Sequence, residues 1–147
     1  MVVQAHVNFI QAGANLIITN SYQSNQNMLM EELKIDATTA NEYLLSTVNL
    51  AKAARSKCSS ENVLIAGSIG PYPDCPASEY NPEYLKRMSV GQLTEWHRPR
   101  FQTLAKSEVD LLAIETIPGL KEAEALLDLL AEYKKGTFQK IKVKIYF

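Results

Sequence analysis

Hydrophobic residues along the chain follow two patterns, one with helical spacing and one of short continuous apolar runs. Four largely apolar runs, at residues 15–19, 62–70, 109–117 and 141–147, predict strands, and the first is of the type buried on both faces. Stripes at helical spacing predict a helix before Gly13, a long one capped by Asp36, a third around Pro99 and a fourth ending at Gly136. Helices and strands thus alternate, an order that produces a parallel sheet through right-handed crossovers.

Three segments interrupt this alternation. Residues 20–35 are read as a polar loop, and the stretch "GPYPDCPASEYNPEY" at residues 70–84 contains four prolines that forbid regular structure. A loop of that length is often functional. Pro99 is expected to kink the third helix or make it restart.

Two architectures fit the predicted order, an open doubly wound sheet and part of a (β/α) barrel. No GxGxxG motif follows the first strand, and "GSIG" at residues 67–70 is too short for a dinucleotide loop. The choice therefore favours the barrel. In both architectures ligands bind at the carboxyl ends of the strands.

The carboxyl ends of the first three predicted strands carry polar residues. The sequences are "TNSYQ" at residues 19–23, "GSIGPY" at residues 67–72 and "ETIP" at residues 115–118. Glu115 directly follows the apolar run "LLAI", and a charge at the end of a buried strand needs a cationic partner or a ligand. Either an ion pair with a lysine or arginine of a neighbouring strand or a bound ligand would meet that need.

Composition narrows the possible partners. The chain has 147 residues, of which 46% are hydrophobic, as is ordinary for a globular protein. Its formal net charge is −1, which gives no electrostatic argument for binding nucleic acid or an anionic membrane. No apolar run approaches the length of a membrane helix. Two cysteines without metal-ligand spacing, Cys58 and Cys75, predict a reducing compartment and a cytoplasmic protein. His6 and His97 are expected to be helix-surface or helix-packing residues rather than metal ligands.

Longer motifs resemble one known family. The blocks "HVNFIQAGANLIITNSYQ", "VLIAGSIGPY", "SEYNPEY", "WHRPRFQTLAKSEVDLLAIETIP" and "EAEALLDLL" are similar, in the same order and at similar spacing, to those of the homocysteine S-methyltransferases. The resemblance covers nearly the whole chain. It implies a (β/α)8 TIM barrel that moves a methyl group from a sulfonium or ammonium donor, such as S-methylmethionine or betaine, to the thiol of homocysteine, giving methionine.

The resemblance also implies a zinc cofactor, because the thiolate rather than the thiol attacks the methyl carbon and zinc holds homocysteine as a thiolate. The family's three cysteine ligands would lie beyond Phe147, and neither Cys58 nor Cys75 matches a ligand motif. The family's first strand would precede Met1. Residues 1–147 are thus expected to form an incomplete barrel domain, about strands 2 to 5 with their helices, that is inactive alone.

Two functional hypotheses follow from the resemblance. The chain is either part of a homocysteine methyltransferase, or a noncatalytic truncated half barrel with a regulatory or interaction role or an incomplete gene product. Its expected partners are small-molecule substrates, and its exposed barrel edges would allow self-association.

Matching positions carry the family's binding roles into this chain. Glu115 matches the carboxylate that receives the amino group of homocysteine. Thr116 is either a donor behind it or a packing residue. The other expected substrate-binding residues are Thr19, Ser21, Tyr22, Gln23 and Ser68, with Gly70 permitting close backbone approach.

The chain departs from the family at two places. "PDCPA" replaces the small residues that usually follow "GPY", which changes the loop over the expected site and leaves the methyl donor open. Lys144 stands where the family has an apolar or aromatic residue.

Overall fold

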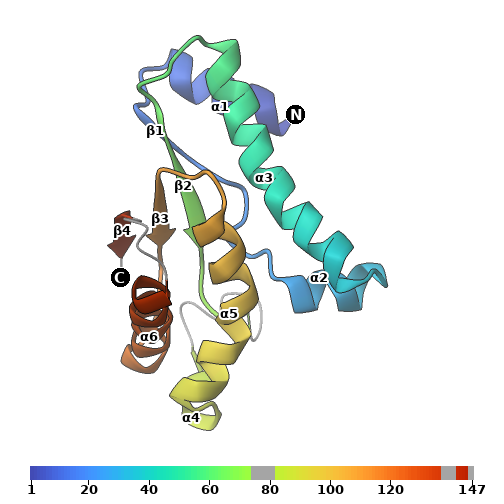
Figure 1. The fold of residues 1–147 in the computed structure, drawn as a ribbon, viewed down its shortest axis with the longest axis vertical. Helices are drawn as coiled ribbons and strands as arrows, with labels where there is room; N and C mark the ends of the chain where they lie inside the picture. The colour runs from blue at the N-terminus through green and yellow to red at the C-terminus, as the bar shows by residue number, and fades with distance from the viewer. Residues whose placement is uncertain (74–81, 137–141, 146–147) are drawn as a thin grey trace.

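The computed structural model describes residues 1–73, 82–136 and 142–145. Within them helices and short strands alternate as the sequence predicts, except that two short helices, residues 26–33 and 84–87, each precede one of the predicted helices (Figure 1). The elements are α1 (Val2–Gln11), β1 (Leu16–Ile18), α2 (Gln26–Leu33), α3 (Ala37–Lys57), β2 (Leu64–Ile69), α4 (Tyr84–Arg87), α5 (Val90–Lys106), β3 (Leu111–Ile114), α6 (Leu120–Gly136) and β4 (Lys142–Ile145).

The four strands form one parallel sheet in the order β1-β2-β3-β4. Leu16 pairs with Leu64, Ala66 with Leu111, and Leu111 with Lys142. Each strand therefore pairs with the next one along the chain. A doubly wound sheet reverses its strand order at a switch point, and these four strands contain no such reversal.

The two faces of the sheet differ in what covers them. Ile65, Ile69, Leu112 and Ile114 pack against helices, in clusters that include buried residues of α1, α3, α5 and α6. On the other face Leu16, Ala66, Leu111 and Ala113 form a cluster whose members all come from strands. The packed helices of Figure 1 thus belong to one side of the sheet.

Local sequence explains where the first helices begin and end. Gly13 adopts φ +101, a backbone conformation that side chains disfavour, directly after α1. Asp36 caps α3, as expected, because its side chain accepts a 2.7 Å hydrogen bond from the Thr39 amide. The expected polar loop at residues 20–35 is wrong in part, because Asn25 caps the helix α2 and accepts from the Asn27 amide at 2.8 Å.

Pro99 does not make α5 restart. The helix runs from Val90 to Lys106 through the proline, and it begins in a capping box of Ser89 and Gln92. Proline removes the hydrogen bond that residue 99 would donate one turn back. Burial of Leu93, Phe101 and Leu104 on both sides of it outweighs that loss, since all three are at most 1% exposed.

The residues at helical spacing on α6 predict a buried stripe of Ala123, Leu126, Leu127, Leu130 and Tyr133, and one member needs correction. Leu127 is 47% exposed, whereas Leu129 is 2% exposed and packs in the main core. The buried face of α6 also includes Ala123, Leu126 and Tyr133, as expected.

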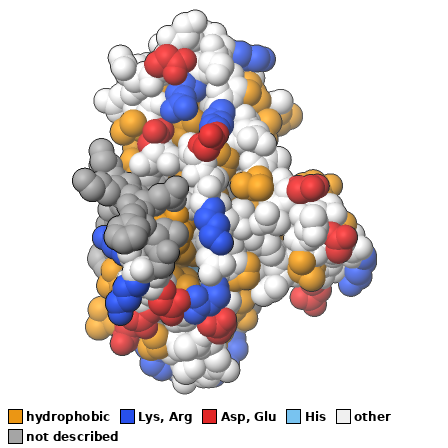
Figure 2. All heavy atoms as spheres, viewed as in Figure 1, with side chains coloured by type: hydrophobic (Ala, Val, Ile, Leu, Met, Phe, Trp, Pro, Cys, Tyr) orange, Lys and Arg blue, Asp and Glu red, His pale blue; other side chains and the backbone are white. Residues whose placement is uncertain are grey.

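Charges are mixed on the molecular surface. Figure 2 shows lysine, arginine and acidic side chains interspersed over the visible face rather than gathered by sign. No helix in the described ranges has the length and apolar character needed to cross a membrane. Cys75 and most of the proline-rich loop, as well as the side chain of Lys144, lie outside the described residues.

Candidate functional site

Glu115 and Ser68 meet at the carboxyl ends of β3 and β2. The Glu115 amide donates to the Ile69 carbonyl at 3.1 Å, which extends the pairing of the two strands by one residue. The Ser68 hydroxyl donates to Glu115 Oε1 at 2.5 Å. Glu115 is half-buried, and the ion pairs of the described residues do not include it. The structure therefore gives Glu115 a hydroxyl partner rather than the lysine or arginine considered from the sequence.

Thr19 and Ser21 join the same site through a ring of hydrogen bonds with Ser68. The Ser68 amide donates to Thr19 Oγ1 at 3.0 Å, and the Ser21 hydroxyl donates to the Ser68 carbonyl at 2.8 Å. Because Ser21 uses its only hydroxyl proton there, the 2.7 Å contact between the two hydroxyls has Thr19 as the donor. Both side chains are buried, and the Thr19 oxygen as acceptor and the Ser21 hydroxyl as donor hold the ends of β1 and β2 together.

Tyr22, Gln23 and Gly70 occupy the rim next to this ring. The Gly70 amide donates to the Tyr22 carbonyl at 3.1 Å, so the loops after β1 and β2 lie side by side. Tyr22 is half-buried, and Gln23 is exposed. Of the six expected binding residues, Glu115, Ser68, Thr19 and Ser21 are thus connected by hydrogen bonds, and Tyr22 and Gln23 follow at the edge.

Thr116 has an unusual backbone. Its φ is +58, the left-handed region that a β-branched residue rarely adopts. Its side chain is exposed, so it does not pack at the strand end as one of the two expectations had it. The turn it makes leads from Glu115 to the buried Ile117 and the start of α6.

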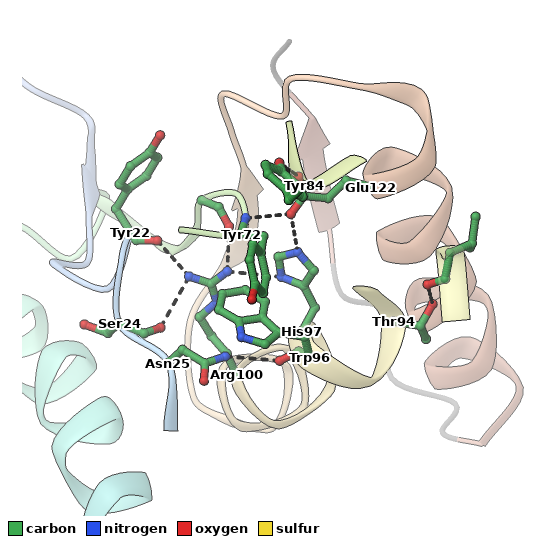
Figure 3. Close-up of polar contacts among 12 residues, drawn as sticks. Tyr22, Ser24, Asn25, Tyr72, Tyr84, Thr94, Trp96, His97, Arg100 and Glu122 are labelled. Atoms are coloured by element: carbon green, nitrogen blue, oxygen red, sulfur yellow. Dashed lines mark hydrogen bonds and ion pairs between the residues drawn. The ribbon is translucent and has the colours of Figure 1, made fainter. Parts of the chain in front are cut away.

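Sequence reasoning missed a buried polar cluster beside the site, which we call the Arg100 cluster and define as His97, Arg100 and Glu122. His97 and Arg100 lie one turn apart on α5, and Glu122 lies in the first turn of α6 (Figure 3). All three are 0% exposed. A signal for the cluster was available in the sequence: a charged residue directly beside an apolar residue of a helix's core-facing side. Arg100 precedes Phe101 in this way, and Glu122 precedes Ala123.

Burial sets the electrostatics of this cluster. Desolvation lowers the pKa of His97 from 6.5 to about 4, although its hydrogen bond to Glu122 acts in the opposite direction. Desolvation also lowers the pKa of Arg100 to about 10, against the attraction of Glu122. At neutral pH His97 is therefore neutral and Arg100 is charged. His97 is a helix-packing residue, as one of the two expectations stated, and His6 is likewise buried on α1.

The described residues do not fit a zinc site. Among them, no three His, Cys, Asp or Glu side chains are grouped so that they could hold a metal ion. Cys58 caps the carboxyl end of α3, before β2 begins, so it lies at the amino ends of the parallel strands, opposite to Glu115. Both ring nitrogens of His97 are already engaged, by Glu122 and Arg100.

A comparison with family models identifies the chain. The model described as homocysteine S-methyltransferase matches residues 1–147. The chain belongs to the homocysteine S-methyltransferase family. This confirms the resemblance found in the motifs.

Curated proteins that are similar to this family member are named as homocysteine S-methyltransferases. A betaine-homocysteine S-methyltransferase of Drosophila melanogaster is 37% identical over 141 residues, which cover 89% of this chain and 43% of the relative. A homocysteine S-methyltransferase of Escherichia coli (strain K12) is 35% identical over 143 residues, which cover 92% of this chain and 45% of the relative. The chain thus spans less than half the length of these relatives.

Solved structures give the same family. The oxidized form of the homocysteine methyltransferase MmuM from Escherichia coli superposes with a TM-score of 0.85 at 33% identity, covering 99% of this family member and 50% of that chain. The metallated form gives a TM-score of 0.81 at 32% identity, covering 99% and 49%.

Proposed function

We propose that this chain provides the homocysteine-binding part of a homocysteine S-methyltransferase, which transfers a methyl group from S-methylmethionine or a similar sulfonium or ammonium donor to the homocysteine thiol. Family membership and the names of the relatives support this activity. The observation that carries the substrate assignment is the half-buried carboxylate of Glu115 at the carboxyl end of β3.

Glu115 would bind the amino group of homocysteine. Ser68 fixes one carboxylate oxygen, Oε1, at 2.5 Å. The other oxygen has no hydrogen bond or ion pair within the described residues, so it is available to an ammonium group. A charge-assisted hydrogen bond of this kind orients the amino acid as well as binding it.

The remaining site residues would divide into two groups. Thr19 and Ser21 use their hydroxyl protons on each other and on Ser68, which suits residues that shape the site behind the substrate. Tyr22 and Gln23 lie at the rim, where an aromatic ring and an amide suit contact with the substrate or donor.

We further propose that residues 1–147 form strands 2 to 5 of a (β/α)8 barrel with their helices. Two observations support this: the strands pair in sequence order, and one face of the sheet carries a cluster made only of strand residues. In a barrel that face is the packed interior, and Glu115 follows β3 at the mouth.

Other features of the proposed activity stay predictions. One similar solved structure is a metallated form of MmuM, which supports a metal in the whole enzyme, and zinc is inferred from the family resemblance. Because the described residues do not fit a zinc site, no step is assigned to a metal held by them. A cytoplasmic location, predicted from cysteine usage, and self-association through exposed barrel edges are also predictions.

Replacement of Glu115 tests the substrate assignment. In the full-length protein, Glu115→Ala should raise the homocysteine KM by about a hundredfold, because a half-buried charge-assisted contact to the amino group is lost. Metal content, measured on the same sample, should not change. Glu124→Ala, on the exposed side of α6, is the matched control and should leave KM as it is.

Loss of metal from the Glu115→Ala protein would show that Glu115 has another role. An unchanged homocysteine KM would remove the substrate assignment. Absence of methyl transfer by the wild-type full-length protein, with each of the two donor types, would overturn the proposed activity itself.

A further inference from the structure

Arg100 contacts both loops that border the candidate site. Its Nη1 donates to the carbonyl of Tyr22 at 2.7 Å and to that of Ser24 at 3.3 Å, in the loop after β1. Its Nη2 donates to the Gly70 carbonyl at 2.5 Å, in the loop after β2. Figure 3 shows the guanidinium between these backbone segments, with the ring of Tyr22 pointing away from it. One planar group therefore holds two loops at a fixed separation.

His97 links Arg100 to Glu122 on α6 through two hydrogen bonds. The guanidinium can only donate, so the 3.1 Å contact between Arg100 Nη2 and His97 Nδ1 makes Nδ1 the acceptor. The proton of the neutral ring is therefore on Nε2, which donates to Glu122 Oε1 at 2.7 Å. This single tautomer satisfies both neighbours, and a neutral ring is what burial enforces.

Glu122 completes the connection. Its Oε1 also accepts from the Tyr72 amide at 2.7 Å, and its Oε2 accepts from the Tyr84 hydroxyl. Tyr72 continues the loop after β2, and Tyr84 begins α4. A buried charge is stable only when it is paired and hydrogen-bonded, and Glu122 supplies the negative charge one imidazole away from Arg100.

The loops held in this way carry the candidate binding residues. Tyr22 directly follows Ser21, whose hydroxyl donates to the Ser68 carbonyl, and Gly70 lies two residues after Ser68. Ser68 in turn holds Glu115. A displacement of either loop would therefore move the carboxylate proposed to bind substrate.

We propose that Arg100, with His97 and Glu122, is a positioning unit that fixes the loops after β1 and β2 and thereby the geometry of homocysteine binding at Glu115. Its residues do not touch the substrate and act through backbone carbonyls and amides. The substrate named in this proposal rests on the proposed function, whereas the connection between the two loops does not depend on it.

Arg100→Lys tests the proposal because it keeps the charge and removes the planar fork. One ammonium group cannot reach the carbonyls of both loops and the His97 ring together. In the full-length protein, amide hydrogen exchange in residues 68–73 should become at least about tenfold faster, since the Gly70 and Tyr72 amides lose the support of their acceptors. The homocysteine KM should rise about tenfold, with metal content unchanged.

Arg98→Lys is the matched control. Arg98 lies on the same helix and pairs with Glu95 and Glu132 at the surface, away from the two loops. It should change neither the exchange of residues 68–73 nor KM. If Arg100→Lys does not fold, His97→Met gives the same test, and His97→Gln should restore KM part of the way because an amide can both accept from Arg100 and donate to Glu122.

The outcomes separate the two proposals. Faster exchange of residues 68–73 with an unchanged KM would overturn the positioning role, as would a raised KM without faster exchange. If the wild-type protein does not methylate homocysteine, the proposed function fails. The exchange of the Gly70 and Tyr72 amides then still decides whether Arg100 holds the two loops.

Discussion

Tyr22 occupies the space that a side chain on Gly70 would need. A Cβ added to Gly70 would lie 2.6 Å from Cε2 of the Tyr22 ring and 2.7 Å from the Tyr22 carbonyl oxygen. Glycine is thus required here by close approach rather than by its backbone angles. The contact explains why the motif "GSIG" ends in glycine. From the sequence, this motif was only judged too short for a dinucleotide loop.

Gly70→Ala should destabilise the protein. The methyl group would force the Tyr22 ring and backbone away, at a cost of about 1–3 kcal/mol in the free energy of unfolding. Chemical denaturation measures this change. Gly91→Ala is the matched control, since a Cβ at Gly91 meets nothing within 4 Å and alanine favours the helix α5 by up to about 1 kcal/mol. Equal effects of the two substitutions would contradict the close-approach argument.

The stability of the protein should depend on pH through His97. Its pKa is about 4 in the folded state and 6.5 ordinarily, so between these values the unfolded chain binds a proton that the folded chain excludes. Stability is therefore full above pH 6.5, and the free energy of unfolding falls by about 3 kcal/mol as the pH drops to 4. The groups that face the ring are Glu122 from α6 and Arg100 and Trp96 from α5.

His97→Gln should remove this part of the pH dependence. Denaturation curves between pH 7 and pH 4 measure the difference in the free energy of unfolding between wild type and variant. Burial also lowers the pKa of His6, but this contribution is the same in both proteins and cancels. Parallel curves for the two proteins would show that His97 takes up its proton in the folded state.

Thr116→Gly should stabilise the protein or leave it unchanged. The left-handed backbone at φ +58 strains a β-branched residue, and the exposed side chain contributes little packing. Glycine relieves the strain at some cost in chain entropy, so we expect a gain of up to about 1 kcal/mol in the free energy of unfolding. Thr38→Gly, an exposed position in the first turn of α3, should instead lose about 0.5 kcal/mol or more. A loss at Thr116 as large as at Thr38 would argue against strain.

The sequence was sufficient for the strands and for the position of Glu115. A charge directly after an apolar run is a local signal, and it located Glu115 at the end of β3. The family resemblance was also available from local motifs. The alternation of elements followed from periodicity, because burial against the sheet imposes that periodicity on α1, α3 and α5.

Sequence reasoning missed the helix α2 and the loop contacts of the Arg100 cluster. The helix α2 was missed because its buried residue is the polar Gln26, so no apolar stripe marks it. The Arg100 cluster was missed because Arg100 bonds to backbone carbonyls 30 to 78 residues earlier in the chain. Carbonyl acceptors have no residue type, and no sequence pattern records them.

The position of Arg100 in the chain has a consequence for the order of folding. The carbonyls of Tyr22 and Gly70 leave the ribosome before α5 does, whereas β2, β3 and β4 can each pair with a strand that has already been made. These strands can therefore be added to the sheet in chain order, from β1 onward, during synthesis. The loops after β1 and β2 reach their final conformation only when Arg100, and then Glu122, has been synthesised.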